Sequence, residues 1–182
     1  DVYKRQTLHS SKKTTTKKNK LLGINPGASY GSSKRWYPKE FADVAIKLSN
    51  QYDIIIFGGQ GEEDIAADIE SYLCEARVEN YQNLAAKTSI TELIRQIDDL
   101  DLLVTGDSGP MHLAAAFNIP TATIFGPTNE QETSQWMNPK NVIIKKSLAC
   151  QPCMKRSCPL GHHNCMKFIT STDVLNAIKT IT

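Results

Sequence analysis

The stretch TGDSGPMHLAAA, residues 105–116, is close to the sequence Gly-Asp-Ser-Gly-Gly-Pro of trypsin-like proteases, with one glycine missing, which would make Ser108 a nucleophile. In a chymotrypsin-like protease the nucleophilic serine lies in an all-β barrel, among strands and turns. Here the run DLDLLVT at residues 99–105 predicts a buried strand, and the run MHLAAAF at residues 111–117 predicts a helix. A strand, a tight polar turn and a helix direct the first backbone N–H groups of the helix into a crevice. That arrangement favours the binding of phosphate or sugar oxygens over a nucleophilic role for Ser108.

Strand and helix patterns alternate along the chain from Leu21 onward, with short turns between them. Pro38 fits the first turn of a helix, and Ser89 with Glu92 matches a capping box. Apolar strands separated by helices imply a parallel sheet that is covered on both faces. We therefore predict a doubly wound, Rossmann-like α/β fold. Its expected strands are 21–25, 53–59, 78–81, 102–106, 121–126 and 142–146, and its expected helices are 38–51, 62–73, 89–97, 110–117 and 172–178.

The composition is that of an ordinary globular domain. The 182 residues are 40% hydrophobic and 22% charged, which fits one domain with a sizeable core. No apolar run approaches the roughly 18 residues that a transmembrane helix needs. The net charge of +2 is too small to imply a nucleic-acid partner, because seven Lys or Arg residues fall within the first 20 positions.

The chain divides into a basic start and one domain. Residues 1–20 predict a flexible basic linker or a truncated start, with binding to nucleic acid or anionic lipid as the alternative. Residues 21–182 form the predicted domain, which includes a Cys-rich loop at 150–165 and a C-terminal helix. The absence of an initiator Met leads us to expect a further domain before this one.

Four glycine-bearing turns follow the predicted strands, and ligands of open α/β sheets bind at this edge. Their sequences are NPGASYGSSKRW, GGQGEE, GDSGPMH and GPTNE. The positively charged residues of these four turns are Lys34 and Arg35. They indicate either a diphosphate clamp or solvated loop charges. Asp107 fits either a partner for sugar hydroxyls or a cap for the following helix. His112, a lone helical histidine, is by itself more typical of a structural residue.

The Cys-rich loop has three interpretations. Four cysteines at spacings of two, four and six are joined there by two histidines, a combination that resembles a zinc ligand set. Structural or free thiols are the favoured alternative, and disulfides are the third, although nothing indicates secretion. We therefore predict no metal, and we expect Cys74, in a helix, to lie in the core. The residues concerned are Cys150, Cys153, Cys158, Cys165, His162 and His163.

Motifs of nucleotide cofactors are missing. The sequence contains no GxGxxG, no Walker A motif and no HExxH, so NAD, ATP and zinc-protease chemistry have no support. We expect no cofactor.

Taken in order, NPGASYGSSKRWYP, FGGQGEE, GDSGPMHLAAA, FGPTNE and CQPCMKRSCPLGHHNCM resemble glycosyltransferase family 9 over residues 21–182. That resemblance implies a GT-B fold, in which two Rossmann-like domains face each other across a cleft. The chain is similar to the second domain, which binds the sugar nucleotide. The residues that the resemblance assigns to the donor are Ala28, Ser29 and Lys34 for the phosphates, Gln60 for the nucleoside, Thr88 for adenine, Asp107 for heptose hydroxyls, and Ser108, Gly109 and His112 around the diphosphate and sugar.

The resemblance also implies a reaction. The family transfers L-glycero-D-manno-heptose from ADP-heptose to an inner-core heptose of lipopolysaccharide, with inversion and without metal. The general base and the acceptor site are expected in an N-terminal domain, so we assign no catalytic residue in this chain. A cytoplasmic location, with peripheral association with the inner membrane surface left open, would follow. The alternatives are another GT-B nucleotide-sugar enzyme and, in a different class, a zinc-dependent interaction module.

Overall fold

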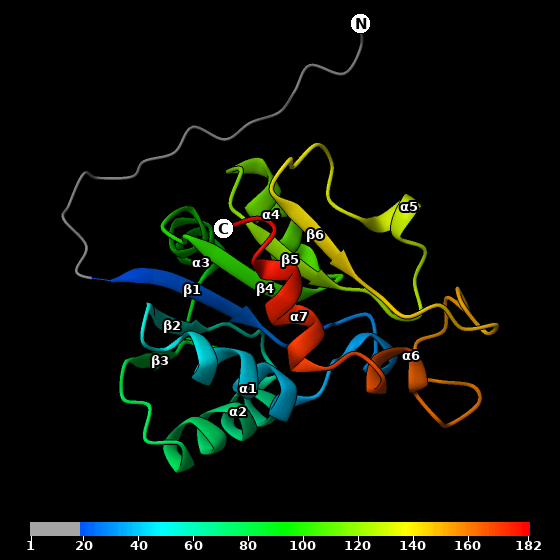
Figure 1. Cartoon of the computed structure of the whole chain (residues 1–182), viewed down its shortest axis with the longest axis horizontal. Coiled ribbons are helices and arrows are strands. Elements are labelled where there is room, and N and C mark those ends of the chain that lie inside the picture. The colour runs from blue at the N-terminus through cyan, green and yellow to red at the C-terminus, as the bar shows by residue number, and fades with distance from the viewer. Residues whose placement is uncertain (1–18) are drawn as a thin grey trace, which may run out of the picture.

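The computed structural model describes residues 19–182, so most of the predicted linker at 1–20 lies outside the described residues. Within that range the chain forms a six-stranded parallel sheet in the order β3-β2-β1-β4-β5-β6 (Figure 1). This is the strand order of the doubly wound dinucleotide-binding fold, and the predicted fold class is confirmed. The strands are β1 (Lys20–Asn25), β2 (Tyr52–Ile56), β3 (Tyr81–Asn83), β4 (Leu102–Gly106), β5 (Thr121–Ile124) and β6 (Asn141–Ile144).

Helices cover both faces of the sheet (Figure 1). Helices α1 (Pro38–Leu48), α2 (Glu63–Glu75) and α7 (Ser171–Ile178) pack on one face. Helices α3 (Ile90–Asp98) and α4 (Gly109–Ala116) pack on the other. The remaining elements are the short helices α5 (Glu130–Thr133) and α6 (Asn164–Lys167) and the 3₁₀ turn η1 (Ser32–Lys34).

The alternation of side chains along each strand produces two cores. In β4, Leu102 and Val104 join the core under α1, α2 and α7, whereas Leu103 joins the core under α3 and α4. Residues of β2 alternate in the same way, with Ile54 on the first side and Ile55 on the second. Successive side chains of a strand point to opposite faces, so a strand buried on both faces must be apolar throughout.

Two helix starts follow the chemistry that the sequence predicts. Pro38 is the first residue of α1. Ser89 caps α3, and its backbone N–H donates to Glu92 at 2.8 Å while its hydroxyl accepts from the Glu92 N–H at 3.3 Å. Thr170 and Asp173 form a second capping box at α7, which the sequence analysis did not identify.

Several local predictions need correction. The short strand expected at 78–81 lies instead at Tyr81–Asn83, where it pairs with β2 in the register Ile54–Tyr81. Strand β1 begins at Lys20, inside the expected linker. Cys74 is helical as predicted but exposed, and its thiol lies 3.1 Å from the hydroxyl of Tyr81 in the edge strand β3. Helices α5 and α6, of four residues each, are too short for a periodic pattern to predict.

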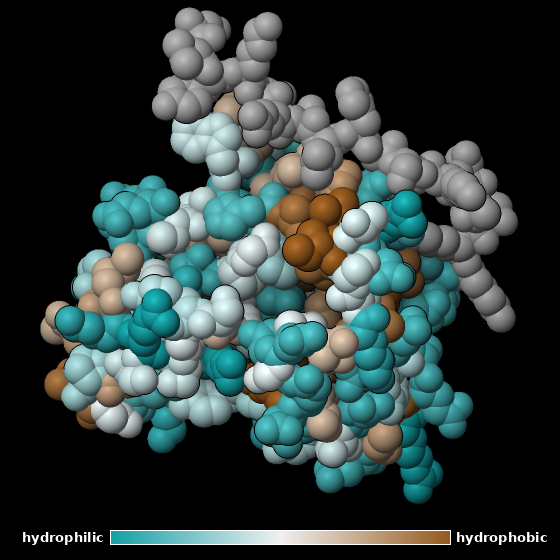
Figure 2. All heavy atoms as spheres, turned by 180° about the vertical axis from the view of Figure 1, so that it is seen from behind, coloured by the Kyte–Doolittle hydropathy of each residue, from teal (hydrophilic) through white to brown (hydrophobic). Residues whose placement is uncertain are grey.

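The rear surface of the molecule is mainly hydrophilic, with one compact hydrophobic area in the upper half of the view (Figure 2). Among the residues that the structure describes, none of the helices has the length and apolar character needed to cross a membrane.

Candidate functional site

A cavity of about 460 Å³ opens at the carboxyl ends of β1, β2 and β4. The two central strands β1 and β4 are neighbours there, and the chain leaves them toward opposite edges of the sheet. Such a switch point is the usual ligand crevice of this fold. Six of the predicted site residues line the cavity, namely Ala28, Ser29, Gln60, Thr88, Ser108 and Gly109.

One carboxylate in this cavity was missed by the sequence analysis as a site residue. Glu62 accepts a hydrogen bond from the Gly59 N–H at 2.8 Å, and its side chain lies against Gly27. A Cβ atom at Gly27 would lie 1.9 Å from the Glu62 Oε2, so a larger residue there would displace this carboxylate. The sequence analysis placed Glu62 at the start of the expected helix 62–73. A carboxylate in a glycine-rich turn after a strand also indicates a ligand-binding residue.

Apolar side chains form another wall of the cavity. Phe57, Ile90 and Leu93 line it beside Thr88, and Ile90 is 77% exposed. Apolar side chains and a carboxylate in the lining of one cavity suit a ligand with a flat apolar ring at one end and hydroxyl groups nearby.

The Ser108 hydroxyl is held by neutral partners. It accepts from the Asn25 amide at 3.0 Å and lies 3.1 Å from the Thr105 hydroxyl. Neither partner is a base, which agrees with the prediction that Ser108 is not a nucleophile.

Ser108 is also the N-cap of α4 but makes no side-chain cap bond. Pro110 has no N–H, and the Met111 N–H donates to the Ser108 carbonyl at 3.2 Å, so Gly109 provides the backbone N–H of the first α4 residues that lines the cavity. The alternative that Asp107 caps α4 is therefore wrong.

Asp107 instead forms a buried ion pair with Lys34. The Lys34 Nζ lies 2.7 Å from the Asp107 Oδ2, and the two residues are 9% and 5% exposed. Thr128 and Thr133 donate to the same oxygen at 2.8 and 3.0 Å. Buried charges need this kind of compensation. The interpretation of Lys34 as a solvated loop charge is therefore wrong, and the pair lies outside the lining of the 460 Å³ cavity.

His112 is exposed in the first turn of α4 and does not line the cavity. An exposed side chain does not serve the core, so a structural role in packing is not supported. Its assignment to the donor stays a prediction.

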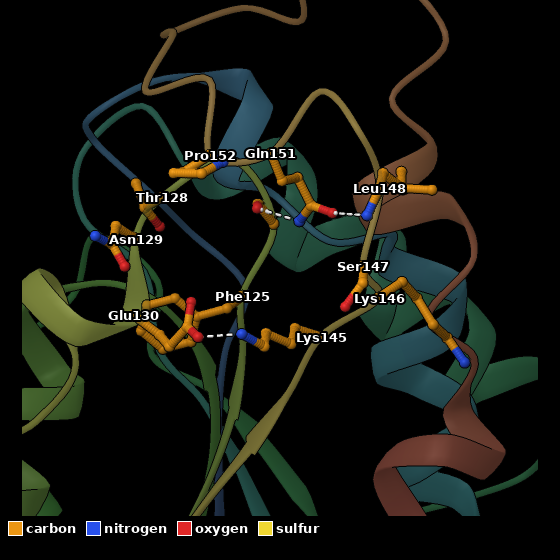
Figure 3. Close-up of a pocket in the computed structure, with 11 residues that line it drawn as sticks. Phe125, Thr128, Asn129, Glu130, Lys145, Lys146, Ser147, Leu148, Gln151 and Pro152 are labelled. Carbon is orange, nitrogen blue, oxygen red and sulfur yellow. Dashed lines mark hydrogen bonds and ion pairs between the residues drawn. The ribbon is translucent and has the colours of Figure 1, made fainter.

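A second cavity, of about 220 Å³, lies where β5 and β6 end (Figure 3). An ion pair between Lys145 and Glu130 spans it, and the hydrogen bond from Lys145 lowers the pKa of Glu130. Gln151 donates to the Gly126 carbonyl at 2.5 Å and accepts from the Leu148 N–H at 3.0 Å. These bonds tie the start of the Cys-rich loop to the turn after β5.

The four cysteines of the Cys-rich loop line one cavity of about 20 Å³, together with His162 and His163. All cysteines of the chain are free thiols, so the disulfide interpretation is wrong. Hydrogen bonds from the His163 backbone, and then from neighbouring backbone N–H groups, lower the pKa of Cys158 despite its partial desolvation. Burial, and then the other three thiols, raise the pKa of Cys165. As they stand, no three Cys, His, Asp or Glu side chains in residues 19–182 are arranged to hold a metal ion.

The model of glycosyltransferase family 9 (heptosyltransferase) matches residues 2–164. The chain belongs to this family. It is 44% identical over 163 residues to lipooligosaccharide heptosyltransferase 2 of Campylobacter jejuni, a match that covers 89% of this chain and 51% of that protein. Lipopolysaccharide heptosyltransferase 2 of Escherichia coli is 28% identical over 162 residues, which cover 88% of this chain and 46% of the relative.

Solved structures agree with the assignment to family 9. The chain superimposes on E. coli ADP-heptose lps heptosyltransferase II with a TM-score of 0.74 and 26% identity, covering 92% of this chain and 48% of that one. The chain spans about half the length of the curated relatives it matches. Its fold is that of one Rossmann-like half of a GT-B heptosyltransferase, as predicted.

Proposed function

We propose that this chain is the donor-binding half of a heptosyltransferase, which transfers L-glycero-D-manno-heptose from ADP-heptose to the inner core of lipopolysaccharide. The observation that carries the proposal is the cavity at the switch point of a family 9 chain, flanked by a buried lysine–aspartate pair. The name of the solved E. coli relative, an ADP-heptose heptosyltransferase, supports this choice of donor.

The nucleoside occupies the cavity in this proposal. Adenine stacks on the apolar wall of Ile90 and Leu93, with Thr88 at its edge. The ribose hydroxyls donate to the carboxylate of Glu62, and Gln60 lies beside it on the same turn. A carboxylate is the group that Rossmann-like sites use for ribose hydroxyls.

The diphosphate lies between Lys34 and the start of α4. An ammonium group has three N–H donors, and the one used for Asp107 leaves two for phosphate oxygens. The N–H of the exposed Gly109, the first residue of α4, adds a donor and the partial positive charge of a helix N-terminus. Ala28 and Ser29 lie on the opposite side, in the turn after β1.

The heptose lies beside Asp107 and His112. In the described part of the chain, the ion pair and the hydrogen bonds of Asp107 all end on Oδ2. The Oδ1 atom is then available to accept hydrogen bonds from sugar hydroxyls. His112, exposed in the first turn of α4, would contribute a ring N–H in this proposal.

The chemistry follows from these positions. An acceptor hydroxyl attacks the anomeric carbon as its bond to the diphosphate oxygen breaks, and the proton of that hydroxyl passes to a general base. Lys34 and the Gly109 N–H stabilise the negative charge that develops on the leaving ADP, so the proposal requires no metal and no other cofactor. We place the general base, the lipopolysaccharide acceptor and any peripheral contact with the inner membrane surface on the half of the enzyme that this chain does not match. The proposed location is cytoplasmic.

Calorimetric titration of the 182-residue chain with ADP-heptose tests the proposal. We expect saturable binding of ADP-heptose, weaker binding of ADP alone, and no detectable binding of UDP-glucose. Preference for a UDP-sugar would favour another GT-B nucleotide-sugar enzyme, the alternative function. No binding of any nucleotide sugar by the folded chain would contradict the proposal.

A further inference from the structure

Three successive carbonyl groups fasten the Cys-rich loop to the turn that follows β1. The Tyr30 hydroxyl donates to the Met154 carbonyl at 2.9 Å. The Ser33 hydroxyl donates to the Lys155 carbonyl, and the Ser33 N–H donates to the Arg156 carbonyl at 3.1 Å. These bonds fix the backbone of the loop at all three positions, and with it the point from which the Arg156 side chain starts.

Gly31 allows the two segments to come this close. A Cβ atom at Gly31 would collide with the Arg156 carbonyl oxygen, which is a backbone atom and cannot swing aside as the end of a side chain can. Such a close approach of two backbones requires glycine. The turn after β1 is therefore shaped to receive Arg156 of the Cys-rich loop.

The ring of Tyr30 faces two positive charges. The Lys34 Nζ lies 4.9 Å from the centre of the ring, and the Arg156 Cζ lies 5.3 Å from it. Both distances are within the roughly 6 Å over which a cation is attracted to an aromatic face. The ring thus holds the guanidinium of the Cys-rich loop near the ammonium that pairs with Asp107.

Arg156 carries a charge that the described residues do not neutralise. Within residues 19–182 no Asp or Glu lies at ion-pair distance from Arg156, whereas Lys145 and Lys146 each have such a partner. The sequence contains no Asp or Glu from residue 133 to residue 172, and Arg156 is exposed. Two cations held on one ring repel each other, and an anion bound to both would remove that repulsion.

We infer that Tyr30 positions Arg156 near Lys34 as a second cation for one diphosphate group. The inference rests on the proposed function, because the diphosphate is that of the nucleotide-sugar donor. A guanidinium presents its N–H donors in a planar fork and binds two phosphate oxygens at once, whereas an ammonium acts as a point charge. The two groups are therefore complementary partners for the two phosphates.

This pair of cations lies next to the donor cavity along the chain. Ala28 and Ser29 line the cavity, and Tyr30 is the next residue of the same turn. A diphosphate that leaves the cavity past Ser29 meets the Tyr30 ring and both cations. As the bond from the sugar to the diphosphate breaks, Arg156 and Lys34 together stabilise the negative charge that develops. Arg156 then contacts the donor itself, and Tyr30 is a positioning residue.

Calorimetry of the 182-residue chain with ADP, and separately with inorganic pyrophosphate, tests the inference. Arg156→Gln should weaken the binding of both by about tenfold or more, as expected for a lost hydrogen bond to a charged group. Its ADP affinity should also fall less on addition of KCl than that of the wild type. Arg156→Lys, which keeps the charge but not the fork, should restore part of the affinity. Because Arg156 is exposed, the midpoint of thermal unfolding should stay unchanged.

Lys155→Gln is the matched control. It removes the same charge from the adjacent position, and Lys155 contacts no aromatic ring among the described residues, so both affinities should stay at the wild-type value. An equal loss in Lys155→Gln and Arg156→Gln would show that only the general charge of the loop matters, and would overturn the role of Arg156.

Variants of Tyr30 test the positioning role. Tyr30→Leu removes the ring and should weaken ADP binding, whereas Tyr30→Phe keeps the ring and should bind ADP nearly as well as the wild type. The double variant Tyr30→Leu/Arg156→Gln should bind about as weakly as Arg156→Gln alone, because both changes disturb the same contact. Losses that add in the double variant would show that Tyr30 does not act through Arg156.

The two ligands separate this inference from the proposed function. Equal ADP affinities for the wild type and Arg156→Gln would overturn the inference and leave the donor site standing. Pyrophosphate binding that depends on Arg156, without binding of ADP or ADP-heptose, would support the pair of cations and contradict the proposed function.

Discussion

At the scale of single residues, the buried Lys34–Asp107 pair is the feature that most constrains function. A pair of this kind seldom stabilises a fold more than apolar residues of similar size would. Thr128 and Thr133 add further bonds to a carboxylate that Lys34 already neutralises. A buried, fully hydrogen-bonded ion pair beside a ligand cavity is typical of a binding site.

Replacing Lys34 tests its contact with the donor. Lys34→Met keeps the aliphatic stem but removes the ammonium, and we expect ADP-heptose binding to weaken by about 1.5–3 kcal/mol, the range for hydrogen bonds to charged groups. Calorimetry measures the change. Lys39→Met is the matched control, because Lys39 pairs with Asp43 on the exposed side of α1 and should leave affinity unchanged. Equal affinities for wild type and Lys34→Met would show that the ammonium does not meet the diphosphate.

Ser108 offers a test of the rejected hydrolase reading. Its hydroxyl contacts only amide, hydroxyl and carbonyl groups among the described residues. A fluorophosphonate probe should therefore leave Ser108 unlabelled, and Ser108→Thr, which keeps a hydroxyl, should bind ADP-heptose nearly as well as wild type. A covalent adduct on Ser108, detected by mass spectrometry, would restore the nucleophile interpretation.

At the scale of elements, the sequence predicted what depends on local chemistry. The capping box of Ser89 and the Pro38 start of α1 follow from residue preferences within one turn. Apolar strands such as β4 are recognisable because both of their faces are buried. The position of β3 was missed because a three-residue edge strand is defined by its pairing with β2, which no local pattern records.

Helix α7 allows stability to be separated from binding. The Thr170 hydroxyl accepts from the Asp173 N–H at 3.2 Å, and neither residue lines the donor cavity. Removal of an N-cap hydroxyl costs about 1 kcal/mol, so Thr170→Ala should lower the free energy of unfolding by that amount. Urea unfolding measures it. Donor affinity should not change, and a loss of affinity would mean that α7 communicates with the site.

The same helix gives a pH dependence. Burial raises the pKa of Asp173, but the hydrogen bonds from Thr170 and the Lys146 ammonium outweigh it, and the net pKa lies below the ordinary value of 3.8. The unfolded carboxyl then takes up its proton at a higher pH than the folded one. This contribution to stability is present above the unfolded pKa and is lost as the pH falls through the lower, folded value.

Asp173→Asn should remove this effect. As the pH falls from about 5 through the folded pKa, which lies below 3.8, its free energy of unfolding should fall less steeply than that of the wild type. Asp43→Asn, in a surface pair on α1, is the control. Identical slopes for Asp173→Asn and wild type would show that the carboxylate is not stabilised in the folded chain.

At the scale of the whole molecule, the site was only partly predictable. The strand-end rule gathered the turns of Ala28, Gln60 and Ser108 at one cavity, because these turns follow neighbouring strands. The fourth predicted turn, which contains Thr128, lines the second cavity instead. The bonds of Thr133 to Asp107 and the contact of Arg156 with Ser33 join segments far apart in the chain, and only the folded structure reveals them. Glu62 was visible in the sequence but was read as a helix-start residue.

The incomplete match to the relatives leads to a prediction about turnover. In the proposed enzyme the donor and the general base lie on opposite walls of a cleft, and positioning of the acceptor lowers the barrier by several kcal/mol that one wall cannot supply. The 182-residue chain should bind ADP-heptose but transfer no heptose to lipopolysaccharide acceptor. A radiolabel transfer assay measures this. Transfer near the rate of an intact heptosyltransferase would locate the base within this chain.

The central position of β1 has a consequence for synthesis on the ribosome. Its register with β4 joins Leu22 to Leu102, so one edge of β1 stays without its partner until about 80 further residues have been made. During that interval the edge of β1 that later pairs with β4 is open to wrong pairing, and β2 can cover only the other edge. Nascent chains that stop before β4 should therefore depend on chaperones, whereas those that extend through β5 can close the sheet around β1.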